Sequence, residues 1–136
     1  MLKKIHTLPE AEKMMPYLKV LTGLIQDTWT SIVELRSQLD KFEGDKEIAE
    51  EIRADLNELI SRVNGYIKEI EDLGVYVQEF KRGVLSIPTL FHGRKVFLCP
   101  TPTENPNVDY FHELDETYQD RQLIGANRKH FLLERI

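Results

Sequence analysis

The sequence predicts an α+β fold, in which a long antiparallel helical hairpin of the coiled-coil type precedes a small antiparallel sheet of three or four strands. Two observations predict it: matched apolar ladders with heptad spacing fill residues 18–73, and β-branched and aromatic runs follow Gly74. A chain of 136 residues is the size of one domain. We expect that domain to comprise a hairpin at about 17–73, a β-rich part at about 75–124 and a tail at 125–136.

The two ladders alternate spacings of three and four residues, which is the repeat of a helix seam. Folding the second ladder back on the first pairs every rung in one register, for example Ile32 with Leu59 and Leu35 with Leu56. Residues 43–45 combine a helix stop with a helix start and supply the turn. The ladders consist of Leu18, Leu21, Ile25, Thr28, Ile32, Leu35, Leu39 and Phe42, and of Ala49, Ile52, Leu56, Leu59, Val63, Tyr66, Ile70 and Leu73.

The start of the first helix carries two opposing signals. Thr7 and Glu10 form a capping-box pattern, which predicts a short helix through residues 14–15. Pro16 has no N–H to donate, so we expect a break or a kink there, with the long helix running over about 17–42.

The second helix and the strands follow in order. Asp45 is placed to cap a helix over about 46–73, and Gly74 to end it in the left-handed conformation. Pro88 and Pro100 are expected at strand ends, where a missing donor does little harm. We expect an ordered loop over 113–126 and a last short helix over 128–136. The predicted strands are 75–77, 84–87, 94–99 and 108–112.

Charge and apolar content exclude several classes of partner. The net charge is −5, and acidic residues outnumber basic ones within 18–73. Because phosphate binding rests on clustered Lys and Arg, we expect no nucleic-acid partner. No apolar run is long enough for a membrane span, and the first residues lack the apolar core of a signal peptide. Cys99 is the only cysteine, and these features together favour the cytoplasm of a prokaryotic cell.

One flank of the predicted hairpin carries apolar residues outside the seam, namely Trp29, Ile60 and Ile67 at e positions. A small sheet spans about 20 Å and cannot cover a hairpin of about 40 Å. Either a second copy of the hairpin covers this flank, giving a homodimer with four helices, or the N-terminal helix or C-terminal tail does. We favour the homodimer.

The densest polar cluster lies within residues 110–122. Past the end of the last strand, His112 and Asp115 can converge on a divalent metal, since imidazole and carboxylate suit several such ions. Arg94 can join Arg121 as a fork for a carboxylate or a phosphate. The alternative for both groups is structural, with charges that bond to loop backbone and to one another. The candidate ligand-binding residues are therefore His112, Glu113, Asp115, Arg94 and Arg121, with His112 and Asp115 as the metal ligands.

Cys99 precedes Pro100 at a predicted strand end. No basic residue adjoins it in the sequence, so we expect a buried, inert thiol rather than a nucleophile.

Several stretches resemble a known family. They are residues 7–11 with Pro16, the heptad hairpin, and the runs 93–99, 111–115 and 121–122, and together they span roughly 5–124. In these stretches the chain resembles the prokaryotic family called domain of unknown function 2203. The family pattern has tryptophan at the positions of Pro100 and Phe111, and glycines just before Arg121. The resemblance implies a fold and a candidate site, and it implies no reaction.

These observations favour a small cytoplasmic interaction or scaffold protein that dimerises through its hairpin. The alternative is a protein that binds a small ligand or a divalent metal, including an enzyme, with its site around 112–122. The chain has no phosphate-binding glycine-rich loop and no Gly-x-Ser-x-Gly elbow, so we lean against an enzyme.

Overall fold

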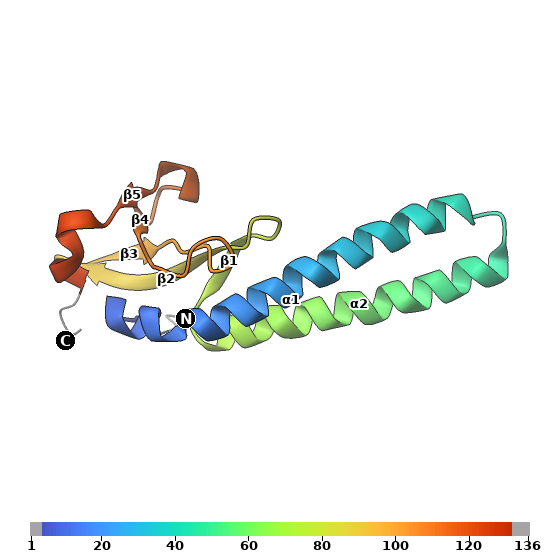
Figure 1. Cartoon of the computed structure of the whole chain (residues 1–136), viewed down its shortest axis with the longest axis horizontal. Helices are drawn as coiled ribbons and strands as arrows, with labels where there is room; N and C mark the ends of the chain where they lie inside the picture. The colour runs from blue at the N-terminus through green and yellow to red at the C-terminus, as the bar shows by residue number, and fades with distance from the viewer. Residues whose placement is uncertain (1–3, 132–136) are drawn as a thin grey trace.

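A computed structural model of the chain describes residues 4–131. Two long helices, α1 (Leu8–Lys41) and α2 (Lys46–Asp72), form a hairpin that precedes a five-stranded antiparallel sheet. Figure 1 shows the sheet beside the start of α1, while the far part of the hairpin projects well beyond it. The predicted combination of helical hairpin and antiparallel sheet is confirmed, with five strands in place of three or four.

The α1 helix begins at the predicted capping box. Thr7 Oγ1 accepts a hydrogen bond from Glu10 N, and the Glu10 carboxylate accepts one from Thr7 N. Of the two outcomes expected at Pro16, the break is wrong, because α1 continues through the proline. Figure 1 shows α1 bending near its start, which agrees with the kink and is the usual effect of an internal proline. One apolar face runs across the proline and offsets the lost hydrogen bond. That face carries the buried side chains Leu8, Ala11, Met15 and Leu18.

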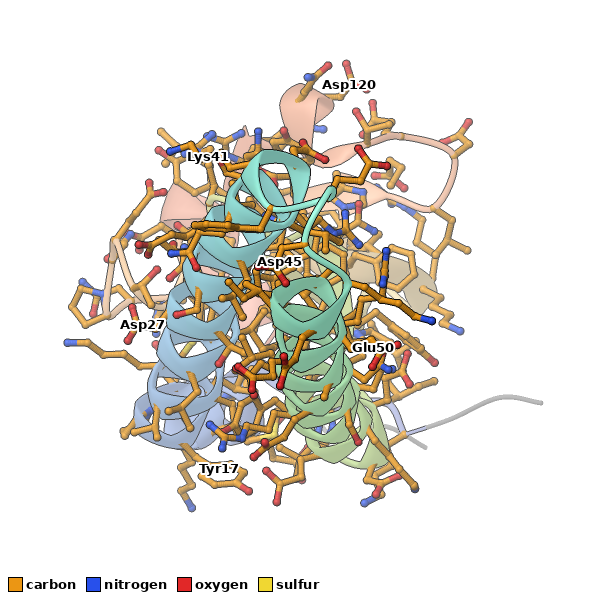
Figure 2. All side chains as sticks on the ribbon, turned by 90° about the vertical axis from the view of Figure 1, so that its right-hand side faces the viewer. Tyr17, Asp27, Lys41, Asp45, Glu50 and Asp120 are labelled. Atoms are coloured by element: carbon orange, nitrogen blue, oxygen red, sulfur yellow. The ribbon has the colours of Figure 1, made fainter. Side chains whose placement is uncertain are left out.

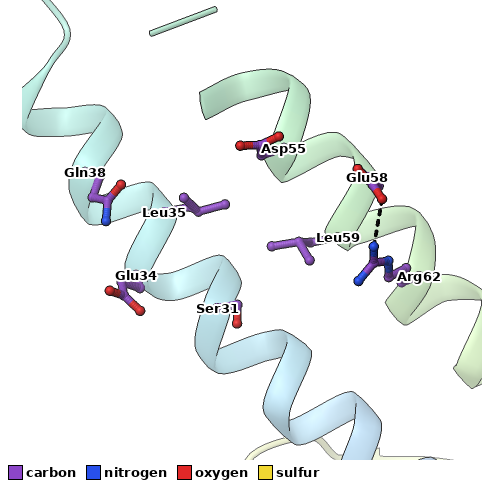
Figure 3. Close-up of a pocket in the computed structure, with 8 residues that line it drawn as sticks. All are labelled: Ser31, Glu34, Leu35, Gln38, Asp55, Glu58, Leu59 and Arg62. Atoms are coloured by element: carbon purple, nitrogen blue, oxygen red, sulfur yellow. Dashed lines mark hydrogen bonds and ion pairs between the residues drawn. The ribbon is translucent and has the colours of Figure 1, made fainter. Parts of the chain in front are cut away.

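The seam of the hairpin is built from the predicted ladders. Leu35 and Leu59 are partly buried against the core, and Figure 3 shows them pointing toward one another. That facing pair lies within one helical turn of the predicted register. Phe42, the last rung, is exposed. The fully buried rungs are Leu18, Leu21, Ile25 and Ile32 on α1, and Ala49, Ile52, Leu56, Val63 and Ile70 on α2.

Both ends of α2 carry the caps that were predicted from the sequence. The Asp45 side chain accepts a hydrogen bond from Ile48 N, and Gly74 has φ +80°, the left-handed conformation predicted for it. Between residues 4 and 131, no helix has the length and apolar character needed to cross a membrane.

The sheet is a simple meander with the strand order β1-β2-β3-β4-β5. β5 lies within the segment predicted as loop, after a short 3-10 helix, η1 (Tyr118–Asp120). The predicted last helix corresponds in part to a 3-10 helix, η2 (Gly125–Phe131), and residues 132–136 lie outside the described residues. The strands are β1 (Tyr76–Glu79), β2 (Val84–Phe91), β3 (Arg94–Leu98), β4 (Tyr110–Glu113) and β5 (Gln122–Leu123).

Pro88 lies inside β2, so its predicted place at a strand end is wrong. The residues of β1 pair only with the first part of β2, which leaves Pro88 with a strand on one side, β3. Its carbonyl accepts a hydrogen bond from His6 N at 2.9 Å. The nitrogen of Pro88, which has no hydrogen to donate, therefore points to a side of β2 where no strand is paired. An internal proline is tolerable at such a position. The same His6 lies with its Nε2 2.7 Å from the Leu73 carbonyl oxygen, at the end of the hairpin.

The two faces of the sheet differ. The helix face, which packs on the hairpin, contributes Leu85, Ile87, Val96, Leu98 and Phe111 to the core. The outer face carries a row of paired residues, Pro88, Phe97 and His112. Figure 1 shows the segment with η1 on the outer side, away from α1, and Figure 2 shows Asp120 of η1 and Tyr17 of α1 on opposite sides of the molecule.

Candidate functional site

His112 lies on the outer face of β4 with only 1% of its surface exposed. Its Nδ1 is 2.8 Å from the Glu113 carbonyl oxygen. Because a carbonyl oxygen only accepts, Nδ1 carries a proton, and in the tautomer with its single proton on Nδ1 the other nitrogen, Nε2, is an acceptor. Nε2 is buried and has no hydrogen-bond partner in the described part of the chain. His112 thus presents a lone pair of the kind that metals bind, with its other nitrogen already oriented.

Arg121 lies close to two aromatic rings on the same outer face. Its guanidinium carbon is 4.9 Å from the ring centroid of Tyr110 and 6.0 Å from that of Tyr118. Its Nη1 donates to the Tyr118 carbonyl at 2.9 Å. Tyr110 pairs with Leu123 across β4 and β5, and extending that register by two residues sets Arg121 opposite His112. The structure therefore brings these two predicted site residues to one face.

Arg94 and Glu113 form a separate pair. Arg94 donates to the Glu113 carboxylate through Nε at 3.0 Å and Nη2 at 2.7 Å. This bond raises the pKa of Arg94 and holds the pKa of Glu113 below its usual value. The Arg94 guanidinium also lies 4.9 Å from the Phe91 ring, on the helix face. The structure thus places Arg94 on the opposite face from Arg121.

Asp115 lies in the turn after β4. Glu113 N donates to the Glu116 carboxylate at 3.0 Å, and Glu116 N donates to the Glu113 carbonyl at 3.1 Å, which closes the turn. Asp115 is exposed at its tip. Over residues 4–131, no three His, Cys, Asp or Glu side chains form a group that could hold a metal ion. Neither His112 nor Asp115 therefore belongs to a group of three such side chains.

One further group, Arg82 with its partner Glu104, was not singled out from the sequence, whereas the neighbouring Cys99 was. Arg82, in the turn between β1 and β2, makes two hydrogen bonds to the Glu104 carboxylate, at 3.3 and 3.1 Å. Lys81-Arg82-Gly83 had only the signature of a turn, and no local spacing connects it with Arg121. Cys99 N donates to the Tyr110 carbonyl, which continues the pairing of β3 with β4 past Leu98.

The Cys99 thiol is buried at 2% exposure. Burial raises its pKa to about 11, and the charges of Arg121 and Arg82 oppose that rise. The thiol is therefore neutral at physiological pH, as expected for an inert cysteine.

This burial predicts slow thiol chemistry. At pH 8 an aromatic disulfide reagent should react with Cys99 far more slowly in the native protein than in guanidinium chloride, because the reactive thiolate is scarce and covered. The release of coloured thiol, followed over time in both states, measures the two rates. Equal rates would show that the thiol is accessible in the folded chain.

The flank of the hairpin that carries Trp29 is partly covered, and by an element that the sequence did not indicate. The Trp29 ring stacks on Phe80 of the β1–β2 turn, with centroids 6.1 Å apart. Gln26 Nε2 also donates to the Lys81 carbonyl at 2.7 Å. Beside these rings lies a hollow of about 400 Å³, lined by Gln26, Trp29, Thr30, Val33, Phe80 and Lys81.

The opposite flank is polar. Figure 3 shows Glu34, Asp55 and Glu58 around a second hollow of about 400 Å³, with Arg62 paired to Glu58 at 2.7 Å. Figure 2, which looks along the hairpin from its tip, shows polar side chains around both helices. The flank with Trp29 is therefore the more apolar of the two.

Comparison with known proteins gives one match. No curated protein and no solved structure matches the chain. A family model matches residues 4–124, which include both helices, all five strands and the pair His112 and Arg121. The chain therefore belongs to the family described as "Uncharacterized conserved protein (DUF2203)".

Proposed function

We propose that this protein is an interaction protein that dimerises through the hairpin flank of Trp29, Ile60 and Ile67. The observation that supports this best is the apolar surface on and beside that flank, where Val33 is 52%, Phe80 39% and Ile60 36% exposed. Clustered exposed apolar side chains on a projecting element are typical of interaction sites.

The size of the flank suits a second copy of the chain. The 27 residues of α2 give a length of about 40 Å, and two helices side by side give a width of about 20 Å. That face has an area of about 800 Å², which is the area that one partner buries in a standard interface.

The charges along the flank also suit a symmetric partner. Arg36 and Asp40 lie seven residues beyond Trp29 and Val33, and Arg53 lies seven residues before Ile60, so heptad spacing puts them on this flank. Both signs of charge thus border the apolar part. A two-fold interface requires a self-complementary patch, and an apolar centre with mixed charges at its edge is one.

We infer that the dimer works in the cytoplasm. The single, buried thiol of Cys99 supports that location, since it needs no oxidising compartment.

Replacing Ile60 with aspartate should convert a dimer into a monomer, because the charge would be buried at the interface without a partner. Sedimentation equilibrium at about 50 µM measures this, well above the dissociation constant expected for an interface of this size. Leu24→Asp is the matched control: Leu24 is 38% exposed, close to the 36% of Ile60, and lies on the opposite flank. That variant should remain dimeric.

Two results would contradict the proposal. One is a monomeric wild-type protein at that concentration. The other is equal dissociation of the Ile60→Asp and Leu24→Asp variants, with both still helical by circular dichroism.

A further inference from the structure

We propose that Arg121 and Arg82 form a binding site for a small oxyanion, a phosphate or a carboxylate, on the outer side of the sheet. This site is separate from the hairpin flank and concerns a ligand rather than a second protein.

The guanidinium group of Arg121 is held in a fixed orientation, as an anion site requires. The rings of Tyr110 and Tyr118 and the hydrogen bond from Nη1 to the Tyr118 carbonyl fix the plane of the guanidinium. Thr117 in turn fixes Tyr118, because its hydroxyl accepts a hydrogen bond from Gln119 N at the start of η1. A planar fork held in advance loses little conformational entropy when it binds two oxygens.

Arg121 also lacks a counter-ion. It is half-buried, yet in the stretch from 4 to 131 no carboxylate forms an ion pair with it, and its Nε and Nη2 make no hydrogen bond to protein. A partly desolvated cation of this kind gains more from an arriving anion than an exposed cation does. Arg94 is the contrast, because Glu113 already occupies its fork.

Arg82 brings a second cation to the same region. Its partner Glu104 has a pKa held below the usual value mainly by the hydrogen bond from Arg82, and Arg121 contributes to that lowering. Both guanidinium groups also act on the Cys99 thiol. Backbone contacts support this placement: Leu85 N, at the start of β2, donates to the Pro100 carbonyl, and Cys99 N donates to the carbonyl of Tyr110, whose ring centroid lies 4.9 Å from the Arg121 guanidinium carbon. Arg82 and its partner Glu104 therefore lie in the same part of the molecule as Arg121. Glu104 is half-exposed and can turn toward water when an anion binds Arg82.

The ligand class follows from the small number of cations in this region. Two guanidinium groups can neutralise one phosphate or carboxylate, but they are too few for a polyanion, whose binding needs many phosphate contacts. A small molecule with a single anionic head fits these charges.

Titration with inorganic phosphate, followed by nitrogen–proton correlation spectra at constant ionic strength against sodium chloride, tests the site. We expect saturable shifts for the Arg121 Nε–H and for the amides of residues 118–122. Acetate in a parallel titration separates the two ligand sources: saturation by phosphate alone assigns phosphate, and saturation by acetate alone assigns a carboxylate.

Variants make the test specific. Arg121→Lys keeps the charge and loses the fork, so affinity should fall about 10-fold or more, as expected for the loss of a charged hydrogen bond. Arg82→Ala should weaken binding several-fold. Arg94→Ala is the matched control and should bind as the wild type does. Shifts that do not saturate, an adventitious ion only, or equal losses in Arg94→Ala and Arg121→Lys would overturn the proposal.

Discussion

Replacing Leu56 with alanine is expected to lower the free energy of unfolding by about 2–5 kcal/mol, because it removes a large side chain from a packed core. Leu56 is 6% exposed in the seam of the hairpin. Leu35 on the facing helix is only partly buried, so Leu35→Ala should cost less than Leu56→Ala. Denaturant unfolding followed by far-UV circular dichroism measures both values.

The comparison needs a fixed protein concentration, since any dimer adds stability that depends on concentration. A loss below about 1 kcal/mol for Leu56→Ala, or a larger loss for Leu35→Ala, would contradict the burial pattern of the seam.

Replacing Gly83 with alanine should also be strongly destabilising, for two separate reasons. Gly83 has φ +69°, which costs an L-residue about 1–2 kcal/mol. A Cβ there would lie 2.5 Å from Thr22 Cγ2, and such overpacking costs about 1–3 kcal/mol more. The β1–β2 turn would have to move away from α1. Thermal unfolding should show the loss as a lower Tm.

Gly93 supplies the matched control. It has φ +79°, yet an added Cβ would meet nothing within 4 Å, so Gly93→Ala should show only the backbone cost. Adding Thr22→Ser to the Gly83→Ala variant should recover part of the difference, because serine lacks Cγ2 and keeps the hydroxyl that bonds to the Leu18 carbonyl. Equal losses at Gly83 and Gly93 would show that the contact with Thr22 does not matter.

The helices could be predicted well because their signals are local. Thr7, Asp45 and Gly74 act within a few residues of where they stand, and burial follows the spacing of the ladders. At Pro16 the sequence left a break and a kink open, because the cost of the proline is local, whereas the packing that keeps the helix continuous involves residues far away in the sequence. The expectation for Pro88 was wrong because β2 lacks a partner strand on one side only beyond the end of β1. No residue near Pro88 in the sequence indicates where that pairing ends.

The candidate site was predictable only in part, since strand faces depend on register. His112 and Arg121 share a face because their strands are neighbours with the right parity. Side chains alternate between the two faces along a strand, and the position of Arg94 in β3 puts its side chain on the helix face. Arg82 joins the region through Glu104, 22 residues further along the chain, and no short pattern indicates such a contact. β5 is two residues long and has no signature of its own.

The bonds of His6 to Leu73 and Pro88 bear on the order in which the chain is assembled. The hairpin and the meander each form from segments that are close in sequence, which is the kind of contact that forms fast. His6 is made among the first residues on the ribosome, but its partner in β2 emerges more than 80 residues later. During synthesis its docking can therefore begin only after both helices and β2 have been made, and it then ties the end of the hairpin to the sheet.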